Sequence, residues 1–124
     1  MKITLPERSL LIKPLLDRVT SEILIAGKDT IAMIILFGSY ARGDWVSDEY
    51  IKGHITYSYQ SDLDIMVIVK KGKHIDYAEP RIEKRLAREL VLDPLSKKPW
   101  ITLIFESIDY VNRQLEKGRY FYSD

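Results

Sequence analysis

The chain has no cysteine and only two histidines among its 124 residues. The absence of cysteine excludes a disulfide framework, a zinc site with thiolate ligands and a thiol nucleophile. The net charge is +1 at pH 7, so composition gives no argument for binding nucleic acid or an anionic membrane. No apolar run approaches the roughly 18 residues of a membrane span, and the start MKITLPERS lacks the apolar core of a signal peptide. We therefore expect a cytoplasmic protein with no membrane partner.

The size and composition indicate one globular domain. Apolar residues make up 46% of the chain and charged residues 30%, and 124 residues can bury one modest core. The last five residues include three aromatic side chains, which need a surface to pack on: Tyr120, Phe121 and Tyr122. We expect residues 1–124 to form a single domain. Either these aromatic residues fold back onto the domain, or the domain is the N-terminal piece of a longer protein, and we favour the second interpretation.

The first half of the chain predicts a helix and two strands. Apolar residues recur at helical spacing from Leu15 to Ala26, with Gly27 as the C-terminal cap. Pro14 either opens this helix in its first turn or separates it from a short turn over residues 9–13. The runs 31–37 (IAMIILF) and 65–69 are short and wholly apolar, which is typical of central strands buried on both faces. Both runs are therefore predicted to lie inside a sheet.

The second half predicts a helix, a strand and a helix. An apolar stripe beginning at Tyr77 indicates a helix that ends before Pro94. The segment 100–105 (WITLIF) is a third strand, and Ser107 can cap a last helix with Gly118 beyond its end. This order predicts the α+β class, close to α/β, with a small mixed β-sheet flanked by helices.

A Tyr-rich insertion, residues 45–60, separates the first two strands. Ile55, Tyr57 and Tyr59 alternate with polar residues, which predicts an extra edge strand or a hairpin. We prefer an edge strand that shields the sheet. The alternative is a lip over a substrate site, on which Tyr57 and Tyr59 would stack a base.

Two carboxylates stand where the second strand begins, in the stretch SDLDIMVIVK. In a strand, Asp62 and Asp64 point to the same face about 7 Å apart. An isolated pair of this kind is more often a solvated strand end than a site. The functional interpretation is a hard divalent cation, since Mg²⁺ binds one or two carboxylates together with substrate phosphates.

A glycine and a serine follow the first strand, in the stretch FGSYARGD. Gly38 lets the backbone approach a ligand, and Ser39 adds a hydroxyl donor where the next helix begins. Alone, this junction is most simply a tight turn with an N-cap serine. Combined with Asp62 and Asp64 on a neighbouring strand, it predicts a site for a metal-bound triphosphate.

These motifs resemble the signature of the DNA polymerase beta-type nucleotidyltransferase superfamily. The segments LFGSYARGDWVS and YQSDLDIMV are most similar to the minimal nucleotidyltransferase domains of bacteria and archaea. Together with the tail VNRQLEKGRYFYSD, they resemble the N-terminal part of bacterial proteins that fuse this domain to a helical HEPN domain. The resemblance spans residues 34–124.

The resemblance implies a fold and an activity. The fold would be the nucleotidyltransferase fold, and the reaction would move a nucleoside monophosphate, AMP in the simplest case, from ATP to a hydroxyl on a protein or RNA. It implies that Gly38 and Ser39 hold phosphates and that Asp62 and Asp64 bind Mg²⁺ or Mn²⁺. Arg42 would reach the phosphates or, as readily, form a surface ion pair. The implied role is the antitoxin half of a toxin–antitoxin pair, with a HEPN domain in cis or trans.

One departure from the family pattern opens an alternative. The family's third acidic residue falls nearest Thr102, which is not acidic. Glu106 shares its face four residues later and is a weak substitute, or simply belongs to the next helix; Asp44 is a weaker candidate. The alternative is a catalytically silent domain that binds nucleotide or a HEPN partner. Contact with RNA and self-association stay open.

Overall fold

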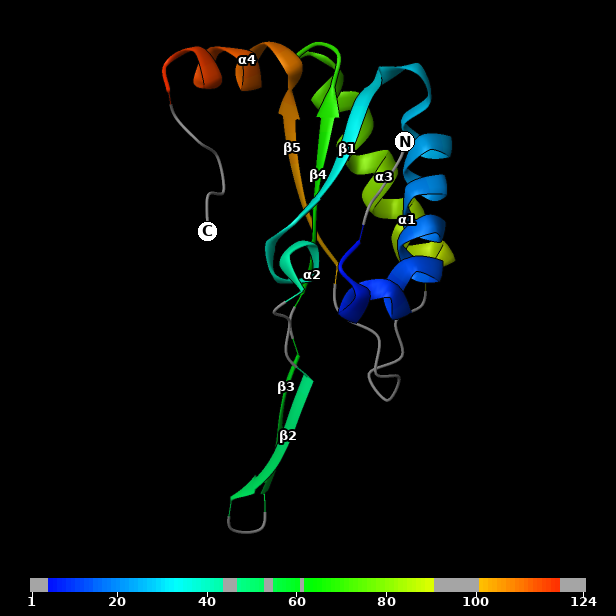
Figure 1. Ribbon diagram of the computed structural model, residues 1–124. Coiled ribbons are helices and arrows are strands. Elements are labelled where there is room, and N and C mark those ends of the chain that lie inside the picture. The colour runs from blue at the N-terminus through cyan, green and yellow to red at the C-terminus, as the bar shows by residue number, and fades with distance from the viewer. Residues whose placement is uncertain (1–4, 44–46, 53–54, 61, 91–100, 119–124) are drawn as a thin grey trace.

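The computed structural model describes residues 5–43, 47–52, 55–60, 62–90 and 101–118. It is an α+β structure with a three-stranded mixed sheet, as the sequence predicts (Figure 1). The predictions for Pro94, Tyr120, Phe121 and Tyr122 lie outside the described residues. In chain order the elements are the 3-10 helix η1 (Glu7–Ile12), α1 (Lys13–Gly27), η2 (Lys28–Thr30), β1 (Ile31–Phe37), α2 (Gly38–Arg42), β2 (Ser47–Lys52), β3 (Ile55–Gln60), β4 (Leu63–Val69), α3 (His74–Glu89), β5 (Ile101–Ser107) and α4 (Ile108–Glu116).

The main sheet has the strand order β1-β4-β5. β1 runs antiparallel to β4, whereas β5 runs parallel to it, with α3 between β4 and β5 in the chain. Parallel neighbours need such a crossover connection, and a helix supplies it. At one end of the sheet the register aligns Phe37 with Asp64, and Asp64 with Thr102.

The helices α1 and α3 lie on the same face of the sheet (Figure 1). Side chains of a strand alternate between its faces, so every second residue of β4 points toward these helices. Asp64, Met66 and Ile68 belong to the opposite face. The β4 residues in the core with α1 and α3 are less than 1% exposed: Leu63, Ile65, Val67 and Val69.

Within the described residues β1 lies at the edge of the sheet, so the prediction that it is central and buried on both faces is wrong. Met33 is 45% exposed and Ile35 is 37% exposed, whereas Ile34 points into the core. Helices cover only one face of the strand, and β4 is its one partner among the described strands. The same prediction is confirmed for β4, which is central and whose residues 65–69 are all buried.

The end of α1 also differs from the prediction. Pro14 lies in the first turn, where a missing N–H costs nothing, as expected. However, Lys28 and not Gly27 adopts the positive φ, at 52°, so Gly27 is not the left-handed cap. Gly27 leaves room for the Ile31 side chain, because an added Cβ would lie 2.6 Å from it and that side chain would have to shift.

The last helix begins and ends as the sequence predicts. The Oγ of Ser107 accepts a hydrogen bond from the backbone N–H of Tyr110 at 3.2 Å, which caps α4. Gly118 follows the helix with a φ of 69°. None of the helices in the described residues is both long and apolar enough to cross a membrane.

The insertion forms a hairpin of its own. β2 and β3 pair antiparallel from Ser47 with Gln60 to Lys52 with Ile55, and they make a separate two-stranded sheet. The hairpin extends past the end of the main sheet that carries α2 (Figure 1). The hairpin prediction is therefore confirmed, and the preferred interpretation of an edge strand on the main sheet is wrong. Base stacking by Tyr57 and Tyr59 stays a prediction.

Candidate functional site

The two motifs meet where β1 ends and β4 begins. Phe37 pairs with Asp64, and the next residue, Gly38, turns the chain into α2 with a φ of 74°. A Cβ at Gly38 would overlap the Asp64 carboxylate, lying 3.2 Å from its Cγ. The expected neighbourhood of the strands is thus confirmed, and the glycine backbone lies directly against one of the two carboxylates.

A buried tyrosine fixes the short helix α2 that carries Ser39. Tyr40 is 1% exposed, and its carbonyl accepts a 2.6 Å hydrogen bond from the Oγ of the buried Ser9. The N–H of Gly43 closes the helix on the Ser39 carbonyl at 2.8 Å. Ser39 is half-buried and Arg42, in the same helix, is exposed. The position of Ser39 is therefore set by the core.

Thr102 connects the acidic residues to the third strand. Its Cα is the partner of Asp64 in the parallel register, and its Oγ1 donates a 3.3 Å hydrogen bond to the Oδ2 of Asp62. Asp62 is exposed and Asp64 is half-buried. Both carboxylates therefore border the same threonine at one end of the sheet.

Glu106 lies on β5, like Thr102, but farther along the strand. It pairs with Ile68, four residues beyond Thr102, which corresponds to about 13 Å along a strand. Partial burial raises the pKa of the Glu106 carboxyl above its usual value. The structure does not bring Glu106 to the acidic pair, which argues against it as the third metal carboxylate. The other candidate, Asp44, lies outside the described residues.

The carboxylates of the candidate site suit a cation that is also bound by phosphate oxygens and water. Within the described ranges, no three His, Asp or Glu side chains group closely enough to hold a metal ion. Asp62 and Asp64 supply carboxylate oxygens, and Mg²⁺ takes one or two of these together with phosphate oxygens and water. Because α2 has only five residues, its N-terminus alone makes no anion site. The Ser39 hydroxyl and the Gly38 backbone are the candidate phosphate contacts.

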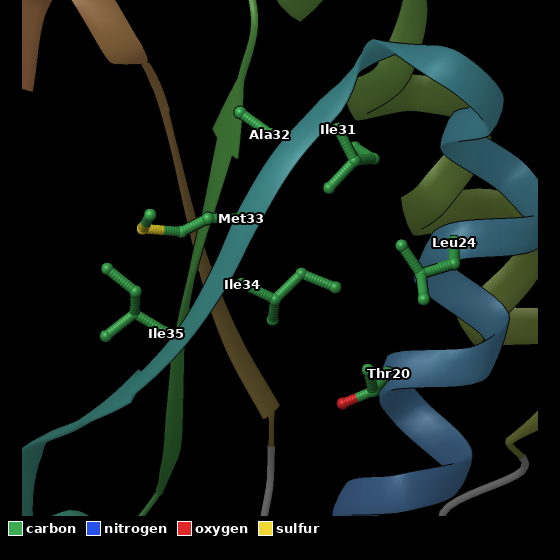
Figure 2. Close-up of a pocket in the computed structure, with 7 residues that line it drawn as sticks. All are labelled: Thr20, Leu24, Ile31, Ala32, Met33, Ile34 and Ile35. Atoms are coloured by element: carbon green, nitrogen blue, oxygen red, sulfur yellow. The ribbon is translucent and has the colours of Figure 1, made fainter. Parts of the chain in front are cut away.

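A separate groove of about 510 Å³ lies along β1 (Figure 2). Thr20 and Leu24 of α1 and residues 31–35 of β1 line it, and Figure 2 shows Ile31 and Ile34 on the side of α1. The Oγ1 of Thr20 is buried there and has no hydrogen-bond partner in the part of the chain that the structure describes. The groove is mostly apolar and none of its lining residues is charged, so it offers no charge to hold a phosphate.

Sequence reasoning missed two contacts that shape the site. The hydroxyl of Thr102 touches Asp62, and Ser9 anchors α2 through Tyr40. Both contacts join residues more than 30 positions apart, and only the strand register or the packing of η1 could have revealed them. The sequence identified Thr102 as the residue nearest the expected acid, and the register pairs Thr102 with Asp64.

Comparisons of the chain with protein-family models, with curated proteins and with solved structures find no match. The function is therefore inferred from the residues of the site and their geometry.

Proposed function

We propose that the chain is an Mg²⁺-dependent nucleotidyltransferase domain that moves AMP from ATP to a hydroxyl on a protein or an RNA. One observation carries the proposal. The turn at Gly38 lies against the carboxylate of Asp64, so a candidate phosphate contact and a candidate metal ligand border the same place. Neither motif alone would be specific, but their convergence favours a bound triphosphate and cation.

The residues of the site would have two tasks, binding the cation and binding a phosphate. Asp62 and Asp64 would hold the cation, and the Ser39 hydroxyl would donate to a phosphate oxygen. Bound Mg²⁺ supplies neutralisation of the triphosphate and of the departing pyrophosphate. The acceptor oxygen would attack the α-phosphorus and lose its proton to solvent water, while the bond from the α-phosphorus to the bridging oxygen breaks and pyrophosphate leaves.

The proposed acceptor is a hydroxyl on a HEPN domain, in cis or in trans, with the chain as antitoxin. What supports this part is the resemblance of residues 34–124 to the nucleotidyltransferase part of such fusion proteins. An RNA hydroxyl is the other acceptor that the same chemistry would serve.

A second candidate is a domain that binds nucleotide without transferring it. The observation that favours it is the residue beside Asp64 on β5, which is Thr102 and not an acid. Transfer would then lack a carboxylate to hold a second ion or to take the proton from the acceptor.

Label transfer separates the two candidates. The chain is incubated with Mg²⁺ and ATP labelled at the α-phosphate, with and without a HEPN protein, and nucleotide binding is measured in parallel by calorimetry. For an enzyme, we expect label on the acceptor and a loss of at least about 100-fold in Asp62→Asn or Asp64→Asn, because each removes a metal ligand.

Glu106→Gln is the matched control. It removes a carboxylate from the same sheet face at a distance from the site, and transfer should stay within about twofold of the unchanged chain. Nucleotide binding without transfer would favour the silent domain. Absence of both binding and transfer would contradict both candidates.

A further inference from the structure

The two carboxylates of the candidate site are held in different ways. Asp64 lies within β4, where the ladder fixes its backbone and the Gly38 turn packs against its side chain. Asp62 precedes the first residue of β4, Leu63, and its side chain is exposed. The strand ladder therefore does not determine the orientation of the Asp62 carboxylate.

The hydroxyl of Thr102 supplies a restraint on that carboxylate. Oγ1 donates to the Oδ2 of Asp62 at 3.3 Å, and the backbone of Thr102 is fixed by its pairing with Asp64. Threonine is β-branched, so few orientations of its hydroxyl are open in a strand. Because this hydrogen bond uses Oδ2, Asp62 can bind a cation through its other oxygen, Oδ1.

The hydrogen bond is long for a hydroxyl donor, which normally lies 2.5–3.0 Å from its acceptor. Hydrogen bonds at catalytic sites are commonly long in the free protein and shorten when substrate binds. Groups that orient a metal ligand typically change metal affinity or activity by about 10- to 100-fold when removed. Asp62 is exposed and precedes the strand ladder, so the hydroxyl of Thr102 should have a large relative effect on the orientation of its carboxylate.

We propose that Thr102 is a positioning residue, whose hydroxyl orients the Asp62 carboxylate for a divalent cation bound with nucleotide. The inference rests on the proposed nucleotide and metal site. It assigns to Thr102 a role that differs from that of the acid expected there: the threonine does not bind the cation and acts through Asp62.

The test measures Mn²⁺ binding in the presence of an ATP analogue with a methylene group between the α- and β-phosphorus atoms. The free Mn²⁺ signal in electron paramagnetic resonance, compared with that of the same mixture of Mn²⁺ and analogue without protein, gives the dissociation constant. Thr102→Val keeps the β-branched shape and loses the hydroxyl, so we expect about tenfold weaker binding. Thr102→Ser restores the hydroxyl, and its dissociation constant should stay within about threefold of that of the unchanged chain.

A double-mutant cycle tests whether Thr102 acts through Asp62. In an Asp62→Asn background, Thr102→Val should weaken Mn²⁺ binding by less than about twofold, because the group that the hydroxyl orients is already altered. The full tenfold loss in that background would overturn the inference. Equal loss in the valine and serine variants would also overturn it, because the hydroxyl would then not be the cause.

The failure of this inference differs from the failure of the proposed function. If the unchanged chain binds Mn²⁺ with nucleotide, and Asp62→Asn weakens that binding while Thr102→Val does not, only the role of Thr102 is wrong. If the unchanged chain binds no Mn²⁺ with the nucleotide analogue, the proposed site is wrong and the role of Thr102 falls with it.

Discussion

Gly38 is the residue at which the constraints of the fold and of the candidate site coincide. Its φ of 74° is a conformation that other residues adopt only with strain, and its Cα faces the Asp64 carboxylate without room for a side chain. A glycine after a strand is common, but few positions require a glycine because a carboxylate packs directly against its Cα. The residue therefore explains why the turn can approach Asp64.

We expect Gly38→Ala to lower the free energy of unfolding by about 2–4 kcal/mol, since it adds strain in φ and an overlap with Asp64. Urea denaturation gives the difference. Gly118→Ala has a positive φ but open space, and should cost about 1 kcal/mol. Gly72→Ala has neither feature and should stay within about 0.5 kcal/mol. Equal effects at all three positions would contradict the role of the overlap.

Glu106 gives a prediction with a defined pH window. Burial raises its pKa in the folded state above the unfolded value of about 4.3. Between these two values the folded chain binds more protons, so the free energy of unfolding falls as pH rises through the window. Glu106→Gln should therefore stabilise the protein at pH 7, by at most about 1 kcal/mol because the group is partly solvated.

The pH comparison provides the control for Glu106. Below the unfolded pKa, near pH 3.5, the glutamate is protonated in both states and should behave like glutamine. Urea denaturation of both proteins at the two pH values measures the effect. If Glu106→Gln stabilised the protein equally at the two pH values, the charge of Glu106 would not be the cause of the stabilisation.

At the scale of elements, the strands β1 and β4 have similar sequences and different surroundings. β1 and residues 65–69 of β4 are both apolar runs, yet β4 lies between two strands and β1 has a partner on one side within the described sheet. Periodicity predicted the position and length of β1 correctly. It could not tell a central strand from an edge strand, because the order of strands depends on contacts between distant segments.

Two isoleucines test this difference directly. Ile65 of β4 is fully buried, and Ile65→Ala should cost about 2–5 kcal/mol of unfolding free energy through lost burial and a cavity. Ile35→Ala is the matched control in β1, where the side chain is 37% exposed, and should cost less than about 1.5 kcal/mol. Thermal and urea denaturation measure both. A larger loss at Ile35 would mean that its face of β1 is covered in solution.

At the scale of the molecule, the sheet has one face covered by α1 and α3 and carries the candidate site at one end. The core lies between the sheet and these helices, and Tyr40 extends it to the helix that bears Ser39. The site is thus built on packed elements, while the hairpin of β2 and β3 forms its own sheet next to it.

The sequence by itself determined the helices, the strands, the α+β class and the two motifs, because local periodicity, caps and turn residues encode them. It also placed Ser107 at the start of α4. Only the tertiary structure decided which strand lies at the edge, that Glu106 stands away from Asp64, and that Thr102 touches Asp62. These features depend on strand order and register, which arise when segments far apart in the chain pack together.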